Sequence, residues 1–201
     1  MIKALIFDVD GVITQLDIPA LYLHFSRSIG LPENFIADYY KEHLQEQLLG
    51  HKLFSDLFLL AKNIKPVLDE ATFKQTWLKK VQALTTVNTE LLELIDDLRT
   101  TYTCGVLTDN SEGRAMMDKK LNLSQHFDFY LESHKEHLKK PDPKFFYLAL
   151  SKANCKAEEA VFIDDKENLA TSASSLGMHG ITFIDNSSLK HYLQMLNVKL
   201  S

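Results

Sequence analysis

The chain has 201 residues, of which 45% are hydrophobic and 24% charged, and its formal net charge is −5. This length suffices for one α/β core, or for such a core with a small inserted domain. Because there is no basic surplus, we expect neither a nucleic-acid partner nor an anionic membrane surface. The two cysteines form no Cys-x-x-Cys pair, and there is no signal-peptide or membrane-spanning pattern, so a cytoplasmic protein is expected.

Five short runs are typical of β-strands, namely residues 3–9, 103–108, 127–132, 160–164 and 180–184. The first, second and fourth are almost continuously apolar, as strands are when both faces of a parallel sheet are covered. Helical patterns separate the later runs, at residues 89–100, 144–153 and 166–176. This alternation predicts βαβ units and a parallel sheet.

Residues 15–85 differ, because they show helical periodicity and no clear strand. Four helices are expected, at 18–30, 33–49, 53–63 and 70–84. The segment is too long for a simple crossover. We therefore predict a four-helix domain at 15–85, inserted into a core formed by 1–14 and 86–201. Hinges are expected near 14–18 and 84–88, and residues 85–89 are polar and β-branched as in a linker.

Polar residues follow the predicted strands at their carboxyl ends, where open parallel sheets bind ligands. They are Asp8 and Asp10 at the end of the first run, Thr108 and Asp109 at the end of the second, Lys140 before the fourth, and Asp164 and Asp165 at its end. Clustered carboxylates repel a phosphate unless a hard cation such as Mg²⁺ joins them. One carboxylate can then act as a nucleophile and another as an acid and base. The pattern predicts phosphoryl transfer to or from a small phosphorylated metabolite.

Each of these residues also has an ordinary structural alternative. The Asp-x-Asp-Gly sequence suits a plain turn, and Thr108 suits a helix cap. Lys140 suits a solvated basic surface, while Asp164 and Asp165 suit the start of the following helix. Their occurrence together, in this order and at strand ends, favours the functional interpretation because independent elements agree.

Four segments resemble the ordered motifs of the haloacid dehalogenase-like (HAD) superfamily: FDVDGV at 7–12, LTDN at 107–110, KPDP at 140–143 and FIDD at 162–165. The resemblance covers essentially the whole chain, and the helical insert resembles the cap of subfamily I. It implies an α/β fold with a Rossmann-like parallel-sheet core and an inserted four-helix cap. The motif set is specific for the superfamily but not for the substrate.

The resemblance implies distinct roles for the first two carboxylates. Asp8 is expected to form an aspartyl-phosphate and to ligate Mg²⁺. Asp10 is expected to protonate the leaving group and then to activate water, while its backbone carbonyl ligates the metal. Superfamily members that dehalogenate carbon generally lack this second acid, so Asp10 favours phosphate chemistry.

The remaining motif residues are expected, on the same resemblance, to bind phosphate and metal. Thr108 and Lys140 would hold phosphoryl oxygens, and Asp109 would offer its backbone N–H. Asp165 is the expected direct metal ligand, with Asp164 beside it or acting through water. Asp109 departs from the smaller or neutral residue common at its position, so an inward-pointing side chain would weaken phosphate binding.

The chain also resembles sugar-1-phosphate phosphatases, through Gly50 and the sequence around it, and β-phosphoglucomutase-like proteins. Gly50 is expected to face the substrate, although it also suits the end of a helix. The mutases usually carry a histidine early in the cap, whereas His24 lies one turn later here. The resemblance therefore implies a Mg²⁺-dependent phosphatase acting on a sugar phosphate. A phosphotransferase or mutase, and a catalytically weak regulatory protein, stay open, as does the choice between monomer and dimer.

Overall fold

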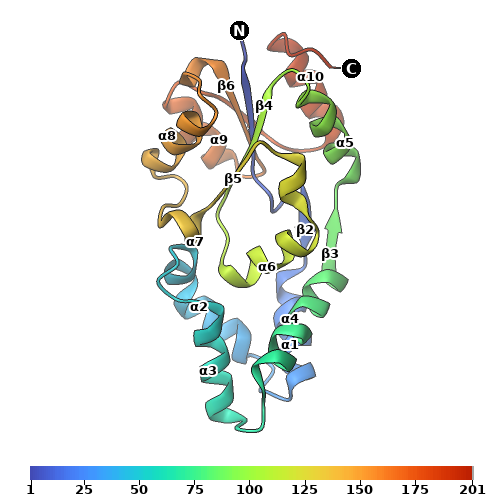
Figure 1. Ribbon diagram of the computed structural model, residues 1–201, viewed down its shortest axis with the longest axis vertical. Coiled ribbons are helices and arrows are strands. Elements are labelled where there is room, and N and C mark those ends of the chain that lie inside the picture. Colours follow the sequence, from blue (N-terminus) through green and yellow to red (C-terminus); the bar gives the residue numbers. More distant parts are fainter. Residues whose placement is uncertain (201) are drawn as a thin grey trace.

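Five parallel strands form a sheet in the order β5-β4-β1-β6-β7 in the computed structural model, which describes residues 1–200 (Figure 1). Their bounds are β1 Ala4–Phe7, β4 Thr103–Thr108, β5 Phe129–Glu132, β6 Ala160–Asp164 and β7 His179–Thr182. Each strand overlaps one of the five predicted runs. The predicted α/β class with a Rossmann-like parallel sheet is therefore confirmed.

The register of the central strand determines which residues meet at the edge of the sheet. Phe7, the last residue of β1, pairs with Val106 of β4 on one side and with Ile163 of β6 on the other. The next residue, Asp8, is therefore level with Asp164. Segments far apart in the sequence thus end side by side, as parallel strands connected by crossovers do.

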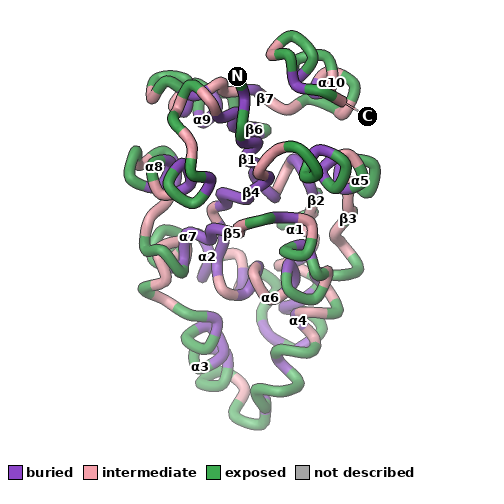
Figure 2. The backbone as a smooth tube through the Cα atoms, turned by 45° about the horizontal axis from the view of Figure 1, so that its top comes forward, coloured by how far each residue is buried: buried purple, intermediate pink, exposed green. Residues whose placement is uncertain are grey.

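Helices cover both faces of the sheet, and Figure 2 shows the strands as a buried centre. The helices of this part are α5 Thr89–Leu98, α6 Glu112–Lys120, α7 Ser133–Glu136, α8 Pro143–Lys152, α9 Glu167–Ser175 and α10 Asn186–Met195, with short 3₁₀ turns at Leu123–His126 and Ala157–Glu159. Leu5 and Phe7 pack on the side of α5 and α10, whereas Ala4 and Ile6 pack on the side of α8 and α9. The two-residue period of a strand thus explains the continuous apolar run.

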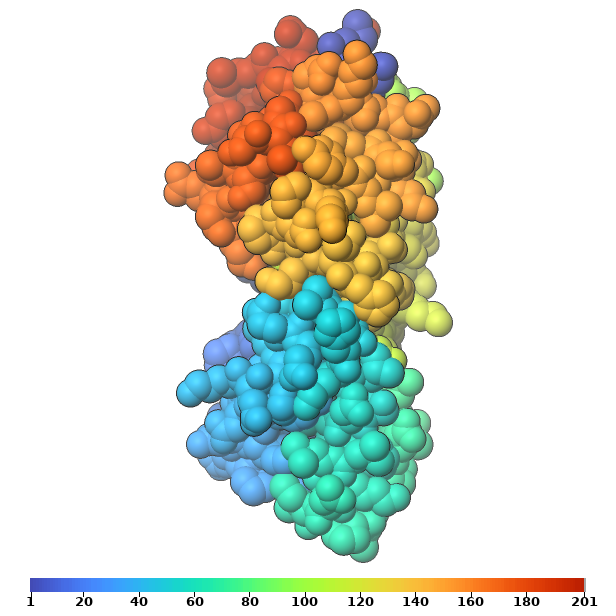
Figure 3. All heavy atoms as spheres, turned by 90° about the vertical axis from the view of Figure 1, so that its left-hand side faces the viewer, coloured from blue at the N-terminus to red at the C-terminus, as the bar shows by residue number. Residues whose placement is uncertain are grey.

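Residues 18–84 contain four helices that form a separate lobe at the end opposite the termini (Figures 1 and 3). They are α1 Ile18–Ile29, α2 Phe35–Leu48, α3 Phe54–Ile64 and α4 Glu70–Leu84, close to the predicted ranges. Their common core is aromatic, with the Phe25 ring 4.9 Å from Phe73 and 5.0 Å from Trp77 between centroids. Among the described residues, no helix is both long and apolar enough to cross a bilayer.

Two short strands connect this lobe to the sheet-containing part. β2 Thr14–Leu16 and β3 Thr85–Val87 pair antiparallel, with Gln15 opposite Thr86. The expectation of no strand within 15–85 is therefore wrong, and the segment expected as a linker is partly a strand. Three residues are too few to show a two-residue period, and the pairing joins segments distant in the sequence, so local patterning did not reveal it.

Candidate active site

The Lys140 ammonium lies between two carboxylates at the carboxyl edge of the sheet. Its Nζ is 2.9 Å from Asp8 Oδ2 and 2.7 Å from Asp164 Oδ2. All three side chains are buried. Because a charge is rarely buried unless it is paired, this arrangement excludes the alternative of Lys140 as a solvated surface lysine.

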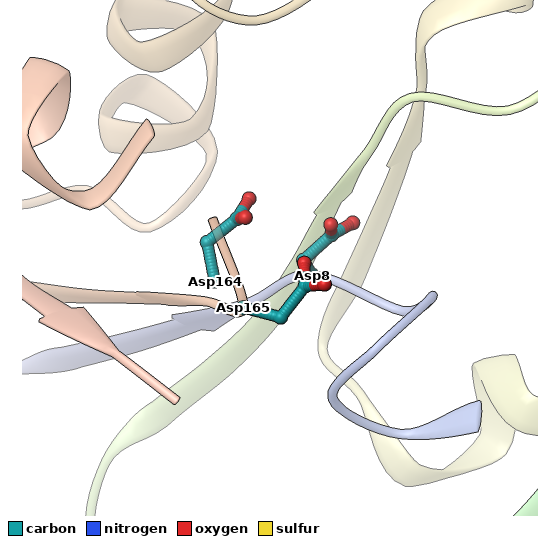
Figure 4. A group of neighbouring side chains, drawn as sticks. All are labelled: Asp8, Asp164 and Asp165. Atoms are coloured by element: carbon teal, nitrogen blue, oxygen red, sulfur yellow. The ribbon is translucent and has the colours of Figure 1, made fainter. Parts of the chain in front are cut away.

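Three carboxylates lie close together at the ends of the neighbouring strands β1 and β6 (Figure 4). Asp8, Asp164 and Asp165 each present one oxygen within 4.8 Å of the others, and Asp165 is exposed. Asp164 also accepts hydrogen bonds from Lys140 Nζ and, at 2.9 Å, from the Lys166 N–H. Carboxylate oxygens retain further lone pairs after such bonds. The group thus fits a hard cation of the Mg²⁺ type, with Asp165 the most accessible donor.

The charges of this cluster depend on one another. Burial raises the pKa of Asp8, the neighbouring Asp164 adds to this effect, and Lys140 opposes it. Burial disfavours the charged form of Lys140, but the attraction of Asp8 and Asp164 outweighs it and raises the lysine pKa. Lys140 therefore opposes the protonation of Asp8 that burial favours, and further positive charge beside Asp8 would favour its ionised form.

The end of β4 lies next to the same cluster. Thr108, the last residue of β4, is buried. Asp109 Oδ1 accepts a hydrogen bond of 3.0 Å from the Lys140 N–H, and burial raises the pKa of this carboxyl. The Asp109 side chain therefore ties the Lys140 loop to β4.

A buried arginine that the sequence analysis missed holds Asp10. Arg114 of α6 donates to Asp10 Oδ1 from Nε at 3.1 Å and from Nη2 at 2.7 Å, and Thr14 Oγ1 donates to the same oxygen at 3.0 Å. Arg114 Nη1 also lies 2.6 Å from Asp118 Oδ1. The spacing of Arg114 and Asp118, four residues apart in a helical segment, was the signal available in the sequence.

Asp118 binds this arginine on the side that faces the protein interior. Its Oδ2 accepts hydrogen bonds from Asn110 Nδ2 at 3.2 Å and from the Tyr130 hydroxyl at 3.1 Å. Burial raises the pKa of Asp118 to about 7, although Arg114 opposes this shift. A polar network thus runs from Asp10 into the interior, and such networks orient the groups at their ends.

Gly50 lies just after α2, where the helical lobe contacts α7. Its φ is +69°, and a Cβ atom there would overlap the carbonyl oxygen of His134. Beside it, His137 Nδ1 lies 2.7 Å from the Leu49 carbonyl oxygen. The close approach explains the glycine at this position. A role for Gly50 in binding substrate stays a prediction.

With this geometry in place, comparison with known families identifies the class of protein. Residues 5–183 match the family model for haloacid dehalogenase-like hydrolases. The chain belongs to this family of hydrolases, and the predicted superfamily resemblance is confirmed.

Among curated proteins, the chain is similar to bifunctional epoxide hydrolase 2 of Rattus norvegicus, with 25% identity over 213 residues. The match covers 94% of this chain but 37% of the relative, so the chain spans less than two fifths of that protein's length. Among solved structures, it is similar to a HAD family enzyme of Bacteroides thetaiotaomicron, with a TM-score of 0.77 and 20% identity over 96% of this chain and 98% of the other. A HAD phosphatase of Thermococcus onnurineus gives a TM-score of 0.68 and 19% identity, with both chains covered completely.

Proposed function

We propose that the protein is a Mg²⁺-dependent phosphatase that hydrolyses a small phosphomonoester through an aspartyl-phosphate. The observation that carries the proposal is the buried Lys140 between Asp8 and Asp164, with Asp165 beside them. A lysine among carboxylates suits a dianionic phosphoryl group only if further positive charge is present. Mg²⁺ held by Asp8, Asp164, Asp165 and the Asp10 carbonyl would supply that charge.

The reaction divides into two displacements at phosphorus. A carboxylate oxygen of Asp8 attacks, the bond from phosphorus to the ester oxygen breaks, and Asp10 gives its proton to the departing oxygen. Water then attacks the phosphorus of the aspartyl-phosphate while Asp10 takes a proton from it. Inorganic phosphate leaves and the Asp8 carboxylate is restored. Lys140 and Thr108 hold the phosphoryl oxygens in both steps.

The helices of 15–85 are proposed to act as a cap on a core of 1–14 and 86–201. Closure would exclude water until the phosphoenzyme has formed. The solved structures give independent support for phosphate chemistry in this fold. One structure of the Bacteroides thetaiotaomicron enzyme contains magnesium and inorganic phosphate, and the Thermococcus onnurineus protein is described as a phosphatase.

The test measures phosphate release by purified protein from acetyl phosphate, sugar phosphates and organic phosphates, with and without Mg²⁺. Turnover is expected only with Mg²⁺, and Asp8→Asn should abolish it while the thermal midpoint is maintained. Asp38→Asn, a neutralisation on the exposed surface of α2, is the matched control and should leave turnover unchanged. Retained turnover in Asp8→Asn would contradict the proposed aspartyl-phosphate mechanism. Transfer of phosphate to a second sugar position, dependent on a bisphosphate primer, would identify a mutase instead.

A further inference from the structure

A cavity of about 120 Å³ begins at Asp10 and Arg114 and extends among the cap helices. Its cap side consists of apolar and aromatic side chains, which are Leu16 of β2, Leu21 and Tyr22 of α1, Leu44 and Leu48 of α2, and Trp77 of α4. Because Asp10 is the proposed proton donor to the leaving group, this cavity lies where the leaving group must be. An apolar cavity of about this size, roughly 150 Å³, holds benzene in an engineered protein.

Three polar side chains on the sheet side of the cavity, Arg114, Asp109 and Asn110, already form hydrogen bonds within the protein. Arg114 is bonded to Asp10 and Asp118, and Asp109 to the Lys140 N–H. Asn110 donates to Asp118 at 3.2 Å, and its Oδ1 lies 3.0 Å from His134 Nδ1. Against the apolar side chains of the cap helices, a sugar would exchange its hydrogen bonds with water for contacts with hydrocarbon, which is costly for each hydroxyl buried there.

The aromatic wall and the mouth of the cavity extend the apolar surface. The Tyr40 ring stacks on Tyr22 at 4.7 Å and 15°, and on Trp77 at 6.0 Å and 6°. Ile18 and Leu44, which also line the cavity, are 44% and 41% exposed. When a ligand covers large apolar side chains at the edge of a site, their removal from water makes the free energy of binding more favourable.

Building on the proposed phosphatase function, we infer that the substrate is a phosphomonoester with a hydrocarbon leaving group of about the size of one six-membered ring. The ester oxygen lies at Asp10, and the hydrocarbon lies against Tyr22, Leu48 and Trp77. The sugar phosphate expected from the sequence resemblance does not suit this surface. Specificity then comes from transfer of the hydrocarbon out of water, with few directional contacts.

A matched pair of substrates tests the inference. Cyclohexylmethyl phosphate and glucose 6-phosphate each carry the phosphate on a CH₂ group attached to a six-membered ring, but only the sugar has hydroxyls. Acetyl phosphate, whose leaving group barely enters the cavity, reports the phosphatase chemistry separately. We expect kcat/KM for cyclohexylmethyl phosphate to exceed that for glucose 6-phosphate at least about tenfold, as pocket discrimination of this kind commonly gives.

A pair of variants tests whether the substrate preference depends on the side chains that line the cavity. Leu44→Asn places an amide at the cavity mouth and should lower the ratio of kcat/KM for cyclohexylmethyl phosphate to that for acetyl phosphate several-fold. Leu59→Asn, at a 57%-exposed position of α3 outside the cavity lining, is the control and should leave the ratio unchanged. Equal or better use of glucose 6-phosphate, with acetyl phosphate turned over, overturns the inference and leaves the phosphatase proposal intact. Absence of Mg²⁺-dependent release from all three substrates overturns both.

Discussion

Arg114 donates two hydrogen bonds to a single carboxylate oxygen of Asp10, although the two residues are 104 positions apart in the chain. The helix that follows the second motif therefore orients the Asp10 side chain of the first motif. Asp118 holds the other end of the guanidinium at 2.6 Å. Because its guanidinium is already engaged by both carboxylates, we assign Arg114 a positioning role, acting through Asp10.

Replacement of Arg114 should reduce catalysis more than substrate binding. Arg114→Lys keeps a cation but not the two-point contact, so we expect kcat to fall about tenfold to a hundredfold with KM changed little. Steady-state kinetics with acetyl phosphate and Mg²⁺ measure both constants. Arg114→Ala removes the cation between two carboxylates and should also destabilise the fold by about 3–5 kcal/mol. An unchanged kcat in folded Arg114→Lys contradicts the positioning role.

Metal binding should be visible in stability as well as in activity. A ligand that binds only the folded state at a hundred times its Kd adds about 2.7 kcal/mol, which for a chain of this size corresponds to a rise of several degrees in Tm. Mg²⁺ should raise the Tm of the wild type, and Asp165→Asn should lose most of this rise. Glu167→Gln removes an exposed negative charge close by and should keep it. A full Mg²⁺ response in Asp165→Asn refutes its role as a ligand.

The buried Asp118 should make stability depend on pH. Its pKa is about 7 in the folded chain and about 3.9 in unfolded chains, so the folded state binds this proton more tightly. Stability contributed by the bound proton is present at low pH and is lost as pH rises toward 7 and above. The free energy of unfolding of the wild type minus that of Asp118→Asn should therefore decrease between pH 5 and pH 8, on the order of 1–3 kcal/mol.

Urea denaturation at the two pH values measures this difference. Subtracting the variant cancels the titration of Asp8 and Asp109, which both proteins share. A difference that is constant or increases with pH contradicts the proposed environment of Asp118.

Gly50→Ala tests the contact between the helical lobe and α7. The new Cβ would both strain a backbone with φ of +69° and overlap the His134 carbonyl. Gly177→Ala is the matched control, since its φ is +89° but its nearest contact is Ala157 at 3.5 Å. Backbone strain alone costs about 1–2 kcal/mol. Urea denaturation should show a larger loss for Gly50→Ala than for Gly177→Ala, and equal losses would mean that the close approach carries no energy.

Local patterns in the sequence determined most of the secondary structure of this protein and its family. The apolar runs identified all five strands of the parallel sheet, and the four motifs identified the HAD family. These features are readable because strand period and strand-end motifs involve neighbouring residues. The helical periodicity of 15–85 likewise gave four helices with bounds close to those observed.

Only the tertiary structure decided how distant segments meet. Three contacts join segments that are far apart in the chain. β2 pairs with β3, Lys140 is buried between two carboxylates, and Arg114 donates hydrogen bonds to Asp10. The cavity beside Asp10 likewise depends on side chains from both the helical lobe and the sheet-containing part. Such contacts follow from packing of whole elements, which no local period encodes. The sequence thus determined the reactive groups, whereas the fold decided what surrounds them.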